Sequence, residues 1–251
     1  MLRLPAGNPS PWTGPGGNNT YLLEGAVPTL IDAGVGEPAH LAALEAALDR
    51  RPLAQILVTH SHPDHVDGVP ALLRRWPQVI IRNALGDSCR DGEVIAAGDG
   101  HLVAVHTPGH APDHFCFFDP ETREVYCGDL ARLGGTIVIP ASKGGDLRQY
   151  LDALRRIRAL APSGLLPGHG PTIDDVDGVI GEYLQHRADR EQQILEILRG
   201  GPHSVEQIVG AIYTGLDPSV LRAAADSVLA HLIKLREDGL ARESAAGWAA
   251  V

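Results

Sequence analysis

Residues 58–68 concentrate side chains that can bind metal ions. The segment has the sequence V-T-H-S-H-P-D-H-V-D-G and directly follows an apolar, strand-like run. Within six residues it holds His60, His62, Asp64 and His65. Neutral imidazole and carboxylate are the usual ligands of zinc and similar divalent ions. One H-x-H pair alone would indicate a solvated turn, but four candidate ligands at this density predict a metal site.

Three further strand-like runs end beside a residue that can bind a metal. T-P-G-H places His110 after one run, C-G-D places Asp129 after a second, and P-G-H-G-P places His169 after a third. Glycine lets the backbone turn sharply and leaves room beside an ion. Each motif alone could be an ordinary turn. Four ligand-bearing strand ends in one chain predict a single shared site.

The whole pattern, H-x-H-x-D-H followed by a single His, a single Asp and a single His, resembles the metallo-β-lactamase superfamily of hydrolases. The N-terminal G-G-N-N-T-Y-L-L and T-L-I-D-A-G segments resemble the first hairpin of that family. The resemblance implies a dinuclear metal site. In it, one ion is held by His60, His62 and His110, the other by Asp64, His65 and His169, and Asp129 bridges them. Asp64 and Asp129 are the catalytic candidates.

The implied ligand set predicts hydrolytic chemistry. Two divalent ions about 3.5–4 Å apart lower the pKa of a shared water from 15.7 to about 7, so hydroxide is available at neutral pH. Such a site suits phosphodiesters, thioesters, lactones and amides. The expected cofactors are two divalent ions per chain, with zinc as the first choice, although N/O ligands also accommodate Fe or Mn.

Composition narrows the function classes. The chain has 251 residues, 44% of them apolar, and a net charge of −10, which disfavours a broad grip on nucleic-acid phosphates. Cys89, Cys116 and Cys127 form no C-x-x-C pair and predict no disulfide framework. The N-terminus lacks an apolar signal region, and no run is long enough to span a bilayer. We therefore expect a soluble, cytoplasmic protein without a membrane partner.

Strands alternating with helices through residue 170 predict an α/β layered domain, which the resemblance sharpens to an αββα sandwich. We place this hydrolase domain at residues 1–175. Residues 5–19, rich in Pro, Gly and Asn, predict an irregular loop in which Trp12 is an apolar anchor or, less favoured, a wall of the pocket. Residues 83–100 are expected to be polar connectors with one short strand.

The remaining residues, 176–251, predict a linker helix and a winged-helix domain: a long helix, two shorter helices and a two-stranded hairpin. The motif E-Y-x-x-H-R-x-x-R-E-x-Q-I-L in the linker helix resembles the subgroup called β-lactamase-like protein two. Members of that subgroup append a winged helix to the hydrolase, and an animal member is an endoribonuclease. A plain helical tail packed on the hydrolase is the alternative.

The subgroup resemblance favours cleavage of a phosphodiester in single-stranded RNA. The net charge of −10 and the 4% aromatic content oppose it, because single-strand binding combines basic grooves with stacking side chains. The enzymatic alternative is a thioesterase of the glyoxalase type that acts on a small molecule. A ligand-sensing regulatory protein with a degenerate hydrolase domain is the third hypothesis.

The winged helix is not expected to bind duplex DNA, because its expected recognition helix, residues 218–238, carries no excess positive charge. We expect it to narrow the metal cleft or to form a homodimer contact.

Four further side chains have open roles. Asp32 could orient a metal-binding His or cap a turn, and His114 could lie behind the site or at the surface. Lys143 and His186 could contact substrate, although solvent exposure is the favoured interpretation for both.

Overall fold

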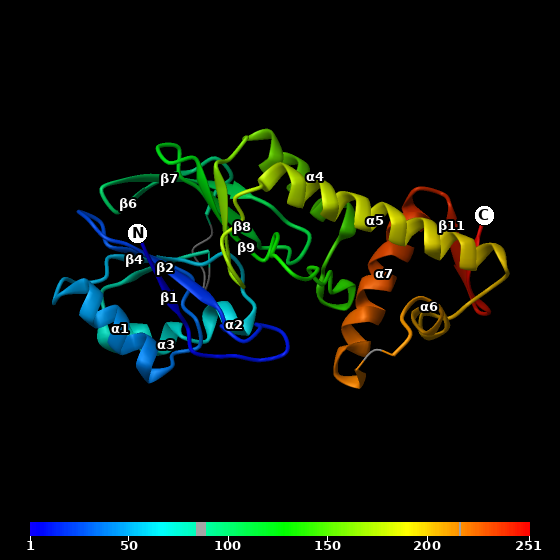
Figure 1. Cartoon of the computed structure of the whole chain (residues 1–251), viewed down its shortest axis with the longest axis horizontal. Coiled ribbons are helices and arrows are strands. Elements are labelled where there is room, and N and C mark those ends of the chain that lie inside the picture. The colour runs from blue at the N-terminus through cyan, green and yellow to red at the C-terminus, as the bar shows by residue number, and fades with distance from the viewer. Residues whose placement is uncertain (84–88, 216) are drawn as a thin grey trace.

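The computed structural model describes residues 1–83, 89–215 and 217–251. Residues 84–88, which fall within the predicted connector, lie outside this description. Two five-stranded sheets form within the described residues (Figure 1). The first has the order β1 (Leu2–Pro5), β2 (Asn19–Leu23), β3 (Thr29–Ile31), β4 (Gln55–Leu57) and β5 (Ile80–Arg82). The second has the order β10 (Gly164–Pro167), β9 (Glu124–Gly128), β8 (Phe115–Phe118), β7 (Gly100–His106) and β6 (Val94–Ala97).

The two sheets pack face to face. Tyr21, Ile31 and Leu57 from the first sheet share one buried cluster with Phe117 and Tyr126 from the second. Strands β2, β3 and β4 are buried at every position, as expected for strands covered on both faces. This inter-sheet core forms the centre of the sandwich.

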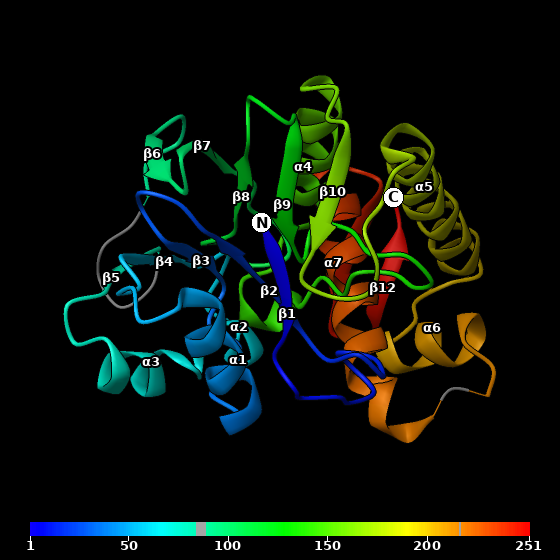
Figure 2. The ribbon, with the colours of Figure 1, turned by 60° about the vertical axis from the view of Figure 1, so that its left-hand side comes forward.

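Helices cover the outer face of each sheet (Figure 2). On the first sheet, α1 (Pro38–Leu48) and α3 (Val69–Arg75) bury Leu44 and Leu72 against Leu30 and Ile56. On the second sheet, α4 (Leu147–Ala159) and the start of α5 (Val176–Arg199) bury apolar side chains around Val125 and Leu165. The layers are helix, sheet, sheet, helix, which confirms the αββα prediction.

Two short elements differ from the sequence expectation. Strand β1 pairs antiparallel with β2, but its residues are mostly exposed, so it carries no buried period-two pattern to reveal it. Helix α2 (Pro63–Val66) is a single turn inside the ligand segment, begun by proline at its first position. This turn projects Asp64 and His65 from helical backbone.

The C-terminal lobe is a winged helix. Helix α6 (Val205–Ile212), the 3₁₀ turn η2 (Pro218–Val220), helix α7 (Leu221–Glu237) and the hairpin β11 (Ala241–Ser244) and β12 (Gly247–Ala250) complete it. Ser204 caps α6 in a capping box with Gln207. The lobe has its own core, which includes Ile208, Leu232 and Trp248.

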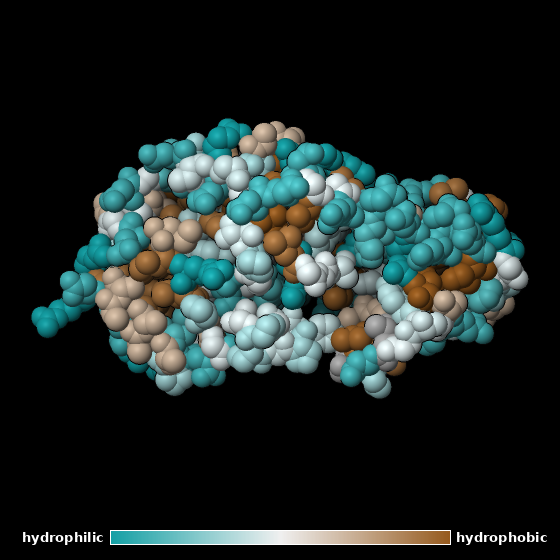
Figure 3. All heavy atoms as spheres, in the orientation of Figure 1, coloured by the Kyte–Doolittle hydropathy of each residue, from teal (hydrophilic) through white to brown (hydrophobic). Residues whose placement is uncertain are grey.

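Helix α5 belongs to both cores. Its first turns contribute Val176 and Ile180 to the core beneath the second sheet, and its last turns contribute Ile194 and Leu198 to the winged-helix core. Figure 1 shows it running from the sandwich into the far lobe, and Figure 3 shows hydrophilic side chains along its outer face. Within the described residues no helix combines the length and apolarity needed to cross a bilayer.

Helix α7 lies against the hydrolase domain. The backbone N–H of Ser142, in the turn η1 (Ala141–Lys143), donates to Asp226 of α7 at 3.2 Å. Arg148 at the start of α4 pairs with Glu237 at 3.5 Å and with Asp238 just beyond α7. Helix α7 and the residue that follows it therefore make polar contacts with the first domain at more than one point.

Candidate metal centre

The structure brings all seven predicted side chains together at one edge of the sandwich. Strands β7, β9 and β10 run in the same direction, so the loops that follow them lie at one edge of the second sheet, beside the loop that follows β4. His60, His65, His110, Asp129 and His169 are buried, whereas His62 and Asp64 are partly exposed. The cluster is therefore largely enclosed, and it is more open on the side of His62 and Asp64.

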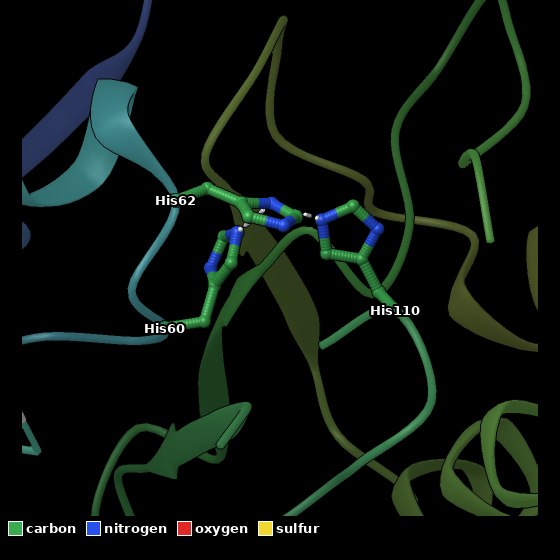
Figure 4. A group of neighbouring side chains, drawn as sticks. All are labelled: His60, His62 and His110. Atoms are coloured by element: carbon green, nitrogen blue, oxygen red, sulfur yellow. Dashed lines mark hydrogen bonds between the residues drawn. The ribbon is translucent and has the colours of Figure 1, made fainter. Parts of the chain in front are cut away.

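Three imidazoles form the first group, shown in Figure 4. Nδ1 of His62 lies 2.9 Å from Nε2 of His60 and 2.9 Å from Nε2 of His110. One ring nitrogen offers a single lone pair or a single hydrogen, so Nδ1 cannot satisfy both neighbours by direct hydrogen bonds. Three nitrogen lone pairs aimed at one point satisfy a divalent cation.

Asp64, His65 and His169 form the second group. Nε2 of His169 lies 3.4 Å from Oδ2 of Asp64, and Nε2 of His65 lies 3.7 Å from the same oxygen. Burial opposes protonation of His169, but the carboxylates of Asp129 and Asp64 outweigh it and raise its pKa to about 9. These carboxylates therefore favour a positive charge between them, which a metal ion can supply.

Asp129 lies between the two groups. Its Oδ1 is 3.2 Å from Nε2 of His169 and 3.5 Å from Nε2 of His65, whereas its Oδ2 is 3.5 Å from Nε2 of His110. The two oxygens of one carboxylate thus face different groups.

Contacts behind the candidate ligands orient their rings. Oδ2 of Asp32 accepts from Nδ1 of His65 at 2.8 Å, and Oδ1 of Asp32 accepts from the backbone N–H of Thr59 at 2.7 Å. Nδ1 of His110 donates to the carbonyl of Val138 at 2.7 Å. The bonds of His65 and His110 place the hydrogen on Nδ1 of each ring and leave the Nε2 lone pair facing the site. Of the two roles considered for Asp32, the structure shows the orienting one.

His114 is fully buried behind Asp129. Its Nε2 accepts from the backbone N–H of Asp129 at 3.2 Å, so its Nδ1 carries the hydrogen and donates to Oγ1 of Thr107 at 2.8 Å. Burial and the nearby His110 lower the pKa of His114 to about 3, which keeps the ring neutral. Of the two positions considered for His114, the structure shows the one behind the site.

Comparison with known proteins identifies the family. Residues 13–88 and 90–169 match the profile described as the metallo-β-lactamase superfamily, and residues 204–248 match the β-lactamase-associated winged helix domain. The chain belongs to the metallo-β-lactamase superfamily. A curated relative and a solved structure match it through both domains.

A β-lactamase-like protein 2 homolog of Caenorhabditis elegans is 31% identical over 259 residues, covering 96% of this chain and 85% of that protein. An atrochrysone carboxyl ACP thioesterase of Aspergillus fumigatus is 33% identical over 210 residues, covering 79% of this chain and 65% of that protein. A metallo-β-lactamase family protein of Thermus thermophilus superposes over 100% of this chain and 98% of its own, with a TM-score of 0.80 at 24% identity.

The side chains of this superfamily member fit divalent metal ions. Nε2 of His65 and Oδ1 of Asp129 are buried and have no hydrogen-bond partner among the described residues. A Cβ built on Gly168 would lie 2.7 Å from His65 and 3.0 Å from Asp129, so the absent side chain keeps this space open. Buried, unpaired N and O atoms around an open space are the donor set that a divalent ion satisfies.

Asn18 is a functional candidate that sequence analysis missed. Its side chain is fully buried and donates from Nδ2 to Oδ2 of Asp64 at 3.2 Å, while its Oδ1 accepts from Asn8 at 2.8 Å. In the sequence, the G-G-N-N segment indicates only the first hairpin. Nothing local marks an asparagine in a loop as the partner of an aspartate 46 residues away.

The prediction that Trp12 is an apolar anchor is wrong, because the residue is 49% exposed. Polar contacts hold the loop instead: Thr13 donates to the carbonyl of Asn8 at 2.7 Å, and Arg132 donates to the carbonyl of Trp12 at 2.9 Å. Lys143 and His186 are exposed, as favoured from the sequence.

Proposed function

We propose that this superfamily member is a hydrolase with two divalent metal ions. His60, His62 and His110 hold one ion, Asp64, His65 and His169 hold the other, and Asp129 bridges them. The observation that carries this proposal is that Oδ1 and Oδ2 of Asp129 face the two groups separately. A degenerate, ligand-sensing site is disfavoured because all seven side chains are present and converge.

When bound, the two ions supply a water of lowered pKa and an electrophile for the substrate oxygen. The two carboxylates have different tasks. The side chain of Asp129 is 12% exposed and fixed on both sides, which suits a bridge. The side chain of Asp64 is 29% exposed, and His169 and His65 lower its pKa to about 2 against the effect of burial. The carboxylate of Asp64 therefore stays ionised at neutral pH, as a ligand of a divalent ion would need to be.

An acyl thioester is the substrate class that the observations favour. The similar protein of Aspergillus fumigatus is named a carboxyl ACP thioesterase, and the similarity covers 79% of this chain. The exposed Trp12 offers an apolar surface on the loop whose Asn18 contacts Asp64. The net charge of −10 disfavours binding of the phosphodiester backbone of a nucleic acid.

A phosphodiester of the RNA type, which the sequence pattern favoured, is the second candidate. Its support is the similarity to the β-lactamase-like protein 2 homolog, which covers 96% of this chain and therefore includes the winged helix. The subgroup resemblance extends to an animal endoribonuclease. The two candidates differ in the bond cleaved and share the metal centre.

One experiment separates the candidates and tests the centre. The purified full chain is analysed for metal content and assayed against acyl thioesters and a single-stranded RNA under the same conditions. We expect close to two ions per chain, loss of one ion in Asp64→Ala or His65→Ala, and turnover of thioesters. RNA cleavage without thioester turnover would reverse the order of the candidates, whereas one tightly held iron and no second ion would contradict the dinuclear centre.

A further inference from the structure

The segment that follows Asp129 returns to the metal centre through a backbone carbonyl. After β9 the chain passes through residues 130–138, and the carbonyl of Val138 accepts the Nδ1 hydrogen of His110 at 2.7 Å. The backbone of residues 130–138 therefore runs from Asp129 to the carbonyl that accepts the hydrogen of His110. The conformation of residues 130–138 sets the position of the Val138 carbonyl and, through it, how the His110 ring is turned.

Two side chains of α5 hold this segment. The Tyr183 hydroxyl accepts from the backbone N–H of Arg132 at 3.1 Å and lies 2.9 Å from its carbonyl, to which it donates. Arg187 donates from Nη2 to Oγ1 of Thr136 at 3.0 Å and to the carbonyl of Ile137. The Ile137 carbonyl belongs to the peptide directly before the Val138 carbonyl, so Arg187 acts one peptide from the acceptor of His110.

Arg187 is buried although its side chain carries a charge. Only 4% of Arg187 is exposed, and its guanidinium lies 5.6 Å from the centre of the Tyr150 ring. No carboxylate pairs with it among the described residues, and its Nε has no hydrogen-bond partner there. Burying a cation without an opposite charge is unfavourable, whereas a leucine or methionine would pack at the same position without that penalty. Nη2 of the guanidinium donates instead to the segment that contains the Val138 carbonyl.

The spacing of the two residues explains the linker-helix motif. Tyr183 and Arg187 are four residues apart and project from the same face of α5. They are the Y and R of E-Y-x-x-H-R, to which the proposed hydrolysis assigns no role. Between them His186 is exposed, so the motif has one face toward residues 130–138 and another toward solvent.

We propose that Tyr183 and Arg187 are positioning residues for the metal centre: by holding residues 132–137, they fix the Val138 carbonyl that orients His110. The inference rests on the proposed metal centre and adds to it a requirement for α5. The ion held by His60, His62 and His110 depends on this contact more than the ion held by Asp64, His65 and His169, because only the first group contains His110.

The test uses the full-length chain loaded with zinc or with cobalt(II). Arg187→Met removes the donors and retains an unbranched apolar side chain, and Tyr183→Phe removes only the hydroxyl. Arg190→Met is the matched control, because Arg190 lies on the same helix and its guanidinium is 4.4 Å from the Tyr213 ring within the winged-helix lobe. Affinity for each ion is measured by competition with a chelating dye, and the geometry at the site by the cobalt absorption spectrum.

We expect Arg187→Met to lower the affinity of the protein for one of the two ions by about tenfold. This is the low end of the range for groups that orient a metal ligand. The cobalt spectrum of that ion should change, and the second ion should keep its affinity. Tyr183→Phe should act in the same direction, and Arg190→Met should match the wild type. Restored affinity in Arg187→Lys, which retains a donor nitrogen, would support the role of the hydrogen bond over that of side-chain volume.

The positioning role is contradicted if a folded Arg187→Met protein binds both ions like the wild type, loses both equally, or behaves as Arg190→Met does. If Arg187→Met does not fold, Tyr183→Phe and Arg187→Lys decide by the same criteria. A wild-type chain that takes up fewer than two ions contradicts the metal centre itself. A wild-type chain with two ions whose variants retain both contradicts only the role of α5.

Discussion

Asp32 offers the sharpest test of how the second metal group is organised. The carboxylate accepts from the Thr59 backbone N–H at 2.7 Å, from the Thr59 hydroxyl at 3.0 Å, and from Nδ1 of His65 at 2.8 Å. Asp32→Asn preserves the volume of this buried side chain. If the amide oxygen keeps the Thr59 backbone bond, the NH₂ group faces Nδ1 of His65.

Two donors would then face each other, and the His65 ring would have to release the Nδ1 hydrogen. The other neutral tautomer carries its hydrogen on Nε2, which is the atom that faces the metal group. A lost hydrogen bond to a charged group is worth about 1.5–3 kcal/mol, which corresponds to metal binding weakened by about 10- to 100-fold. The loss should concern the ion held by Asp64, His65 and His169.

The assay is equilibrium competition of the folded variant against a chelator, followed by metal analysis of the protein. Asp67→Asn is the matched control, because Asp67 is an exposed aspartate in the same segment. We expect Asp32→Asn to retain one ion at a chelator concentration at which wild type and Asp67→Asn retain two. Wild-type affinity for both ions in a folded Asp32→Asn protein would refute the argument from the tautomer.

Three other outcomes are expected. Asp129→Ala should lower turnover by at least about 100-fold with the fold largely retained, and Asp129→Asn should lower it nearly as much, because a neutral amide is a poor bridge between two cations. Values of kcat/KM and circular dichroism spectra check this, and near-wild-type turnover would exclude the bridge. Gly109→Ala should destabilise the chain by about 2–4 kcal/mol in chemical unfolding, because Gly109 has φ +136° and a Cβ there would lie 2.3 Å from the Tyr150 backbone nitrogen; an unchanged unfolding midpoint would show that α4 can shift. The full chain should not bind duplex DNA at micromolar concentration, because α7 contacts η1 and α4; a salt-dependent fluorescence-anisotropy signal in that range would show that α7 is available to DNA.

The clustering of the seven candidate ligands could be predicted from the sequence. His110, Asp129 and His169 each follow a strand and stand beside a glycine, and the other four lie within six residues soon after β4. Strands that run in the same direction end at one edge of a sheet, which brings His110, Asp129 and His169 together, and the loop that carries His60 lies beside that edge. The αββα order followed from the same alternation of strands and helices.

The groups that orient the ligands were harder to predict. The acceptor for His110 is a backbone carbonyl at Val138, which any residue type could provide. The partner of Asp64 is Asn18, and the contact exists only after the first loop folds across the sheet edge. The residue types around Asn18 and Val138 do not indicate such contacts, whereas burial and hydrogen bonding in the folded chain show them directly.

The course of α5 through two cores limits how this architecture can be recombined. A graft of a foreign winged helix at residue 176 would replace Val176, Ile180 and Tyr183, which belong to the core beneath the second sheet. A graft at residue 200 would keep Ile194 and Leu198 from the old helix against a new lobe. The practical junction lies inside the helix, between Arg187 and Ile194, where the side chains pass from one core to the other. In a chimera joined there, the first part of α5 would still pack beneath the second sheet, and the last part would come with its own winged-helix lobe. The linker would be a continuous helix rather than a flexible chain.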